Sequence, residues 1–388
     1  MSGDLAGAGT SAAPWPRVAV DDASPRAAAR ARYIVLTPGV TGRDGVSAVS
    51  RLVLAAVASD GVSTSVVSLG DRPDAVAPAP GFARAGLRVA AGRKLCFAAG
   101  ALGAAAKPPA PVEVICLHLA LSPVAWLAAR GRARLTVFLH GIEAWRPLGA
   151  MRRWLLARAE TLVANSEHTA RRFRDANRTL ATSPIRICHL GAAAGPPANE
   201  PPRAADPPFA LIVGRMAAAE RYKGHDLLLD LWPSVAAAAP EAGLIVAGDG
   251  DDRARLEAKA RALGVRATFL GHVTDDALEA LYGDCTFFVM PSRDEGFGLV
   301  FLEAMRAGKA CIGSVGAAAE VIRDGVTGLV VDPGNPEQVA GALRRLFREP
   351  ETRVRMGAAG AERFAQRFTE AHFRRRFRAA LGLPADAA

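Results

Sequence analysis

Short apolar runs rich in β-branched residues alternate with longer amphipathic stretches through most of this sequence. Residues 33–36, 62–69 and 135–139 are such runs, while residues 46–59 and 150–159 carry apolar side chains at helical spacing. Strands that alternate with helices form parallel sheets, because each helix carries the chain back to the end of the sheet at which the previous strand began. This alternation predicts an α/β fold.

The same alternation restarts in the second half of the chain after one interruption. Residues 191–208 are rich in Gly, Pro and Ala and lack periodicity, which is typical of a linker. A length of 388 residues also exceeds a usual single core. We therefore predict two Rossmann-like domains, residues 31–195 and 206–368, with a C-terminal helix at about 369–383 that packs back on the first. Residues 1–30 are rich in Ala, Gly, Ser and Pro and predict a flexible tail.

The individual elements follow from the same patterns. Further strands are predicted at residues 112–117, 162–164, 185–189, 209–213, 244–247, 267–270, 285–290, 311–314 and 328–331. Further helices are predicted at residues 121–130, 167–175, 225–237, 253–263 and 299–307. Open parallel sheets bind ligands at the carboxyl ends of their strands, so the site is expected in the cleft between the two domains.

The net charge of +10 is unevenly distributed. Residues 1–200 contain 24 Lys and Arg against 13 Asp and Glu, a balance of +11, whereas residues 201–388 contain 24 against 25, a balance of −1. This asymmetry indicates an anionic partner or surface for the first domain. The segment 145–158 combines Trp145 and Trp154 with arginines. It fits either the headgroup region of an anionic membrane or an ordinary basic helix packed on the sheet.

Other compositional features narrow the setting of the protein. No basic platform interleaved with aromatic residues is present, so nucleic acid is not an expected partner. No segment near the start has signal-peptide character. The cysteines lack the spacing of metal ligands, so we expect buried free thiols in a reducing cytoplasm, with peripheral contact to the inner face of the membrane as an open alternative. These cysteines are Cys96, Cys116, Cys188, Cys285 and Cys311.

Residues 289–308 combine the end of a strand, a glycine-bearing loop and a helix. The strand stops at Pro291, and the helix predicted at 299–307 follows a polar loop. Backbone N–H groups in such a turn can face an anion or a sugar hydroxyl. Glu295 lies in the loop and Glu303 lies in the helix among apolar neighbours, where partial desolvation is expected. A surface loop followed by a helix with one tolerated glutamate explains the same pattern.

Two cations precede a predicted helix in the second half. Gly214 and Arg215 follow a strand, and Lys223 and Gly224 come just before the helix at 225–237. A cation pair beside a helix N-terminus suits a diphosphate. A solvated basic loop is the alternative. No G-x-G-x-x-G pattern supports a standard dinucleotide site.

Two further positions have a functional and a structural interpretation. Asp249 and Asp251 flank a glycine and match a pattern that can hold Mg²⁺ or Mn²⁺, but an N-cap of the next helix is favoured. His140 ends an apolar strand, where it can bond a sugar hydroxyl or a phosphate. A structural histidine satisfied by backbone carbonyls is its alternative.

Taken together, these motifs resemble retaining glycosyltransferases of family 4. The resemblance covers residues 210–347, with weaker similarity at Gly45, His140 and 165–167, and it implies the GT-B fold. The motifs are Gly214-Arg215, Lys223-Gly224, Gly248-Asp249-Gly250, Pro291-Ser292, Glu295-Gly296-Phe297-Gly298, Glu303-Ala304, Gly308, Glu320 and Gly325-x-x-Gly328.

The resemblance implies a role for several residues. Arg215 and Lys223 would hold the donor diphosphate, Glu295 would position the transferred sugar, and Glu303 would bond the ribose. His140 would lie near the reacting carbon. The remaining donor-binding positions implied are Gly45, Gly214, Val273, Gly296, Phe297, Gly298, Leu299 and Val300. Asp44-Gly45 departs from the paired glycines of many members, and Gly316-Ala317 departs at a second glycine pair.

The expected function is therefore transfer of a sugar from a UDP- or GDP-sugar to a glycan or lipid-linked acceptor, as in cell-surface polysaccharide biosynthesis. Arg215, Lys223 and helix N–H groups would stabilise the leaving diphosphate, so neither a metal nor another cofactor is expected. The alternatives are a non-catalytic nucleotide-sugar-binding subunit, or an epimerase or hydrolase on the same fold.

Overall fold

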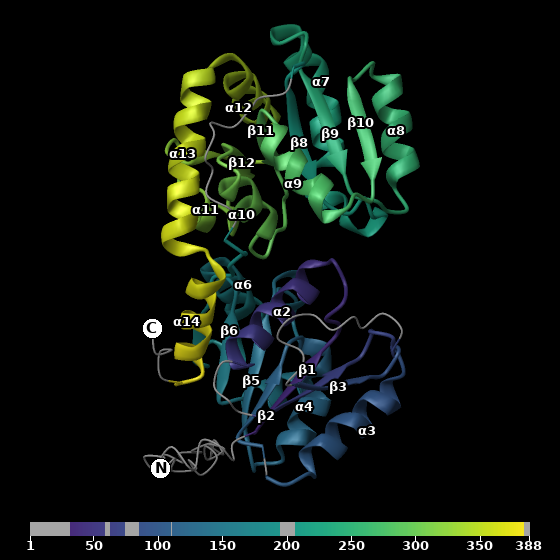
Figure 1. Cartoon of the computed structure of the whole chain (residues 1–388), viewed down its shortest axis with the longest axis vertical. Coiled ribbons are helices and arrows are strands. Elements are labelled where there is room, and N and C mark those ends of the chain that lie inside the picture. The colour runs from purple at the N-terminus through teal and green to yellow at the C-terminus, as the bar shows by residue number, and fades with distance from the viewer. Residues whose placement is uncertain (1–31, 59–62, 74–84, 110, 195–205, 384–388) are drawn as a thin grey trace, which may run out of the picture.

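The computed structural model describes residues 32–58, 63–73, 85–109, 111–194 and 206–383. Each half of the chain forms one parallel β-sheet flanked by helices, and the two halves are stacked along the long axis of the molecule (Figure 1). The tail predicted at residues 1–30 and most of the predicted linker lie outside the described residues. The two Rossmann-like sheets identify the architecture as GT-B.

The first sheet has the strand order β3-β2-β1-β4-β5-β6-β7, with every pairing parallel. The order reverses between β1 and β4, so the loops that follow these strands diverge at the carboxyl edge. The strands are β1 (Arg32–Thr37), β2 (Ser63–Ser68), β3 (Ala85–Val89), β4 (Glu113–Cys116), β5 (Arg134–Leu139), β6 (Thr161–Ala164) and β7 (Ile185–Ile187). The helices are α2 (Gly45–Ala58), α3 (Lys94–Ala105), α4 (Ser122–Ala129), α5 (Ala150–Leu156) and α6 (Glu167–Ala176).

The second sheet has the order β10-β9-β8-β11-β12-β13, again with parallel pairings. Its switch point lies between β8 and β11. The strands are β8 (Phe209–Val213), β9 (Gly243–Ala247), β10 (Ala267–Gly271), β11 (Phe287–Met290), β12 (Cys311–Ser314) and β13 (Gly328–Val331). The helices are α7 (His225–Ala238), α8 (Arg253–Ala262), α9 (Asp275–Asp284), α10 (Leu299–Arg306), α11 (Ala318–Val321) and α12 (Pro336–Arg348), and a 3-10 segment, η6 (Ala218–Lys223), precedes α7.

The C-terminal helices connect the two halves a second time. α13 (Pro350–Arg367) runs along the second half, and α14 (Glu370–Ala380) then packs against α2 of the first (Figure 1). At this crossing, Ala192 N donates to Phe368 O at 2.9 Å and Glu370 N donates to Ala192 O at 2.9 Å. The two halves of the chain are therefore tied together at this crossing.

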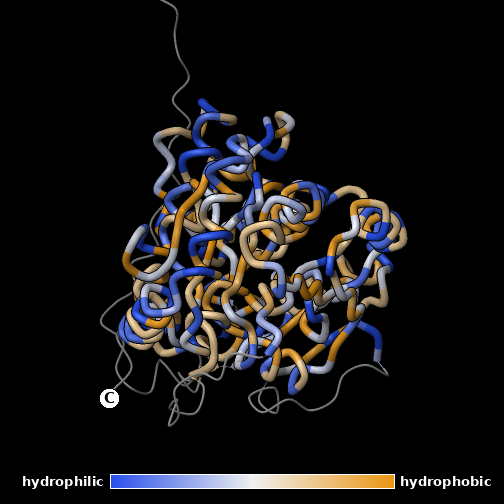
Figure 2. The backbone as a smooth tube through the Cα atoms, turned by 90° about the horizontal axis from the view of Figure 1, so that it is seen from above, coloured by the Kyte–Doolittle hydropathy of each residue, from blue (hydrophilic) through white to orange (hydrophobic). Residues whose placement is uncertain are grey.

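Apolar side chains fill the space between each sheet and its helices. All four residues of β4 and of β11 are buried, because helices cover both faces of the sheets. Seen from above, apolar segments run through the interior and hydrophilic segments lie mostly at the periphery (Figure 2). Within the described residues, none of the helices combines the length and apolar character needed to cross a membrane.

Most predicted elements are confirmed, with a few corrections. The strand β3 and the helices α3, α9, α11, α12 and α13 were not predicted, and the helix expected at 150–159 ends at Leu156. The strand expected at 285–290 begins at Phe287, because Cys285 follows the end of α9. The expectation that the cysteines are buried holds for four of them and is wrong for Cys96, which is exposed at the start of α3.

Candidate active site

The loop between β11 and α10 lies at the carboxyl edge of the second sheet. Its last residue, Gly298, has φ = +87° and is the N-cap of α10. A side chain at Gly298 would collide with the ring of Phe301, so glycine is required both by conformation and by space. Phe297 is buried, and Leu299 and Val300 are half-buried in the first turn of α10.

This loop touches the first domain through its backbone. A methyl group on Gly296 would overlap the carbonyl oxygen of His140, and a methyl group on Gly141 would lie 2.9 Å from Gly296 Cα. Gly141 has φ = +152°. The structure therefore brings His140 and the loop that carries Glu295 together across the cleft, and glycine at both positions permits the approach.

The His140 side chain is held by the main chain of the neighbouring strand. Its Nε2 lies 2.6 Å from Leu117 O, and its backbone N donates to Glu143 Oε1 at 2.6 Å. A carbonyl oxygen can only accept, so Nε2 carries the proton and Nδ1 of the neutral ring is an acceptor. Burial lowers the pKa of His140, and the nearby Glu143 carboxylate opposes this only in part. The structure thus contains a histidine whose Nε2 is hydrogen-bonded to a backbone carbonyl, as the structural interpretation predicts. Its Nδ1 can accept a hydrogen bond from a ligand.

Arg215 and Lys223 lie on either side of a carboxylate that was not predicted as part of the site. Arg215 Nη2 donates to Glu220 Oε1, and Lys223 Nζ lies 3.8 Å from Glu220 Oε2. The Arg215 side chain is 66% exposed, whereas those of Lys223 and Glu220 are 19% and 15% exposed. Glu220 Oε2 is buried without a hydrogen-bond partner among the described residues.

The cationic loop and the glutamate loop are joined directly. Arg293 N donates to Tyr222 O at 2.8 Å. Gly224 has φ = +94°, and a methyl group there would lie 2.9 Å from Pro291. Gly214, at the end of β8, faces the Lys223 side chain, because a methyl group on it would lie 3.4 Å from Lys223 Cδ. These contacts place Arg215 and Lys223, which are predicted to bind a diphosphate, beside the loop that is predicted to bind the sugar.

Glu303 is partly buried, as expected, and has one hydrogen-bond donor that the sequence did not indicate. Tyr282 OH donates to Glu303 Oε2 at 2.7 Å. Burial raises the pKa of Glu303, although the Tyr282 hydrogen bond and Arg306 partly offset this. Among the described residues, the second carboxylate oxygen, Oε1, has no hydrogen-bond partner.

The loop before α2 differs from a simple phosphate-binding turn. Asp44 Oδ1 accepts from Val46 N at 2.9 Å and from Ser47 N at 3.0 Å. Burial alone would raise the pKa of Asp44, but hydrogen bonds from Ser47 and Val46 lower it below its usual value. The Asp44 carboxylate therefore already caps this helix N-terminus. A methyl group on Gly45 would meet nothing within 4 Å.

Arg43 forms a second set of contacts between the two domains. Arg43 Nη1 lies 2.7 Å from His272 Nε2 and donates to Val273 O at 3.1 Å. The Arg43 guanidinium also lies 3.8 Å from Asp275. Val273, predicted to bind the donor, is thus in contact with the first domain through its carbonyl oxygen.

The N-cap interpretation of the Asp249 and Asp251 pair is wrong. The N-cap of α8 is Asp252, and its side chain makes no capping hydrogen bond. Asp251 Oδ1 instead accepts from Ala218 N at 2.8 Å, and Asp249 Oδ1 accepts from Gly250 N at 2.9 Å. Among the described residues no group of three or more His, Cys, Asp or Glu side chains could hold a metal.

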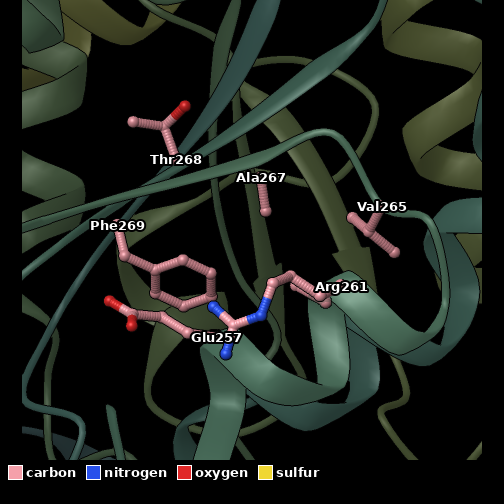
Figure 3. A pocket seen from close by; sticks show the side chains of 7 residues that line it. Glu257, Arg261, Val265, Ala267, Thr268 and Phe269 are labelled. Carbon is pink, nitrogen blue, oxygen red and sulfur yellow. The ribbon is translucent and has the colours of Figure 1, made fainter. Parts of the chain in front are cut away.

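One hollow of the second domain lies away from the loops described above. It has a volume of about 310 Å³ and lies between α8 and the edge strand β10. In Figure 3, Glu257 and Arg261 extend from the helix beside the ring of Phe269. Since none of its lining residues belongs to the loops described above, this hollow is not the candidate site.

Comparison with known proteins agrees with this arrangement. Residues 198–363 match the family described as glycosyl transferases group 1. The GDP-mannose-dependent alpha-(1-6)-phosphatidylinositol monomannoside mannosyltransferase of Mycobacterium tuberculosis is 38% identical over 150 residues, which are 36% of this chain and 39% of that protein. The D-rhamnosyltransferase WbpZ of Pseudomonas aeruginosa is 38% identical over 168 residues, 42% of each chain. The matched region thus spans about two fifths of these relatives.

Solved structures match over nearly the whole chain. The structure of HepE from Anabaena, in complex with UDP and glucose, has a TM-score of 0.73 at 18% identity and covers 91% of this chain and 99% of that one. Sucrose-phosphate synthase from Thermosynechococcus elongatus also has a TM-score of 0.73, at 19% identity, with 91% and 98% covered. At this identity the likeness shows the fold alone. The chain has the GT-B fold, and its residues 198–363 are similar to the group 1 family of glycosyl transferases.

Proposed function

We propose that this protein is a retaining, metal-independent glycosyltransferase. It transfers a sugar from a UDP- or GDP-sugar to a glycan or lipid-linked acceptor in cell-surface polysaccharide or glycolipid biosynthesis. The observation that carries the proposal is the meeting of Arg215, Lys223, the Glu295 loop and His140 at facing edges of two parallel sheets. Relatives named as mannosyl- and rhamnosyltransferases, and a structural neighbour described with UDP and glucose, support this choice of substrates.

In this proposal the second domain binds the donor. Arg215 and Lys223 bind the diphosphate, and Glu303 accepts a hydrogen bond from the ribose. Glu295 and the N–H groups of Phe297 and Gly298 bind the sugar. The remaining donor contacts come from Gly214, Val273, Gly296, Leu299 and Val300.

The first domain supplies the acceptor side of the reaction. We assign residues 31–195 to acceptor binding and residues 206–368 to donor binding. His140, neutral at pH 7, offers Nδ1 as an acceptor to a hydroxyl of the transferred sugar near the reacting carbon. Gly45 approaches the phosphates from the loop before α2, but the neighbouring Asp44 carboxylate makes this the weakest contact of the set.

The chemistry needs stabilisation of one developing charge. When the bond to the sugar breaks, negative charge develops on the leaving diphosphate. Arg215 and Lys223, which Glu220 holds close together, stabilise this charge electrostatically. The acceptor attacks from the face that the diphosphate leaves, and a phosphate oxygen takes its proton. This retains the anomeric configuration without a protein nucleophile.

A donor screen tests the proposal. UDP- and GDP-sugars are compared by the thermal shift they produce, and the stabilising donor is then incubated with a lipid extract in the presence and absence of excess EDTA. We expect one donor class to stabilise the protein and to yield a glycosylated product in EDTA. Loss of product on chelation, restored by Mn²⁺ or Mg²⁺, would contradict metal independence. Conversion of the donor without transfer would favour an epimerase or hydrolase.

We further propose that the first domain docks on an anionic membrane through α4 and α5. The side chains of Met151, Trp154 and Leu127 are 63%, 45% and 40% exposed, although they are apolar. Arg158 stacks on the Trp154 ring at 3.8 Å. Indole and arginine together suit the headgroup region. Trp145 does not belong to this surface: it is buried, with Arg172 over its ring at 4.6 Å.

A further inference from the structure

The N-terminus of α6 in the first domain is capped from the second domain. The N-cap residue Ser166 accepts a hydrogen bond from Thr169 N at 3.0 Å. The carboxylate of Glu320, on α11, accepts hydrogen bonds from the first two N–H groups of α6. Glu167 N donates to Oε2 at 2.8 Å, and His168 N donates to Oε1 at 2.7 Å. A carboxylate is the preferred group at this position, because the helix N-terminus carries partial positive charge.

The Glu320 carboxylate has a third partner and a firm support. His189, which follows β7 in the first domain, places Nε2 2.9 Å from Glu320 Oε2. On the other side, Arg363 of α13 donates to Glu320 O at 2.9 Å and to Val321 O at 2.8 Å. The side chains of Glu320 and His189 are only 17% and 22% exposed. All three carboxylate bonds therefore cross between the domains, and those from His168 N and His189 Nε2 are partly buried.

The same helix end also holds the loop that carries Glu295. Ser166 Oγ donates to Gly296 O at 2.8 Å, and Thr169 Oγ1 lies 3.3 Å from the same oxygen. Gly296 is adjacent to Glu295, which is proposed to bind the transferred sugar. The position of α6 against the second domain thus fixes the backbone of the sugar-binding loop.

The contacts that Arg43 makes between the domains are weaker than those of Glu320. Arg43 and Asp275 face each other at 3.8 Å with side chains that are 51% and 84% exposed. Exposed ion pairs contribute little, whereas partly buried hydrogen bonds to a charged group, such as those from His168 N and His189 Nε2 to Glu320, contribute more. The Glu320 contact is therefore the stronger of the two connections.

We propose that Glu320 is a positioning residue that clasps the two domains in the closed arrangement and thereby places the Glu295 loop against the first domain. Its role in turnover rests on the proposed glycosyl transfer, whereas its role in closure does not. The donor is bound mainly by the second domain, so loss of the clasp lowers turnover and leaves nucleotide binding intact.

The test replaces the carboxylate by an amide of the same shape. In Glu320→Gln, one oxygen that accepts from α6 becomes an NH₂ group, so one backbone donor loses its partner. The matched control is Glu362→Gln, because Glu362 is exposed on α13 and is bonded only by Gln366 Nε2 among the described contacts. Hydrogen–deuterium exchange of peptides that cover residues 166–173 reports the clasp, and UDP or GDP calorimetry and steady-state kinetics report its consequence.

For Glu320→Gln we expect amide exchange at residues 167–168 to accelerate about tenfold or more, the effect of losing one charge-assisted hydrogen bond. We also expect kcat to fall about tenfold while the nucleotide Kd changes less than about twofold, since the clasp does not touch the nucleotide. Glu362→Gln should match the wild type. Unchanged exchange in Glu320→Gln would overturn the clasp. Parallel loss of nucleotide binding and turnover would show a merely structural role. If the wild-type protein transfers no sugar, the exchange data still decide the closure claim.

Discussion

At the scale of single residues, the sequence indicates which charged side chains belong to the candidate site, but not which side chains they contact. The sequence indicates four charged candidates, Arg215, Lys223, Glu295 and Glu303. The fold brings the loop that carries the two cations against the loop that carries Glu295. The sequence alone gave no sign that Glu220 lies between the two cations, because that contact depends on the turn of η6.

The cationic pair supports a prediction about nucleotide affinity. Arg215→Ala or Lys223→Ala should weaken UDP or GDP binding by about 1.5–3 kcal/mol, the contribution of a hydrogen bond to a charged group. Isothermal titration calorimetry measures the change. Arg266→Ala is the control, because Arg266 pairs with the exposed Glu241 away from the cleft. Wild-type affinity in both Arg215→Ala and Lys223→Ala would remove these residues from the diphosphate site.

At the scale of elements, strongly patterned segments were predictable and contacts between elements were not. The strand, glycine loop and helix at 289–308 are confirmed as β11, its loop and α10. The strand β3 and the helices α3, α9, α11, α12 and α13 were not predicted; in α3 the apolar residues run through nearly the whole segment and show no helical spacing. The approach of Gly296 to His140 joins two domains and has no local signal in the sequence.

This backbone approach can be tested by adding one methyl group. Gly296→Ala would place Cβ against the carbonyl oxygen of His140, so the domains could not close as they do. We expect turnover to fall at least about tenfold, because displacement of a positioning loop by an ångström has effects of that order. Gly283→Ala is the matched control: nothing lies within 4 Å of its Cβ, and a helical Gly to Ala change is neutral or stabilising by up to about 1 kcal/mol. Equal turnover of the two variants would contradict the close approach.

The first residue of α7 gives the molecule a predicted pH dependence. Burial and the neighbouring Lys223 lower the pKa of His225 to about 4, and its Nε2 has no described hydrogen-bond partner. The folded state favours the neutral ring. The stability this residue contributes is therefore present above pH 6.5, where the unfolded chain is also neutral, and is lost as the pH falls towards 4.

Replacing the ring by an apolar side chain should remove this dependence. In His225→Leu the free energy of unfolding should fall less between pH 6.5 and 4 than in the wild type, by on the order of 3 kcal/mol for a pKa difference of this size. Urea unfolding across the pH range measures it. His272→Leu, a change at an exposed histidine, should leave the wild-type profile in place. Parallel curves for His225→Leu and the wild type would refute the assignment.

At the scale of the whole molecule, the uneven charge distribution distinguishes the two domains. The balance is +11 for residues 1–200 and −1 for residues 201–388. Exposed apolar side chains of α4 and α5 form the surface that we propose docks on a membrane. Composition could predict the charge asymmetry, but only the fold separates the exposed Trp154 from the buried Trp145.

Vesicle binding tests this surface. Each basic residue near an anionic bilayer contributes about 1 kcal/mol and is screened by salt, so the protein should bind anionic vesicles at low salt and dissociate as salt rises. Charge reversal at Arg152, Arg153 and Arg158 should reduce retention in co-sedimentation. Reversal at Arg261, Arg345 and Arg348 of the second domain is the control and should change little. Equal retention on neutral and anionic vesicles would identify the segment as an ordinary helix face.

The facing loops of the two domains are proposed to transfer a sugar with retention of its anomeric configuration. NMR of a reaction with the stabilising α-linked nucleotide sugar and its acceptor measures the anomeric configuration of the product directly, through the one-bond C–H coupling constant at the new anomeric centre. We predict an α-linked product and free nucleoside diphosphate, with formation at least about tenfold slower in Arg215→Ala, whose lost charge stabilises the leaving group. A β-linked product, or equal rates for the variant and the wild type, would contradict the account.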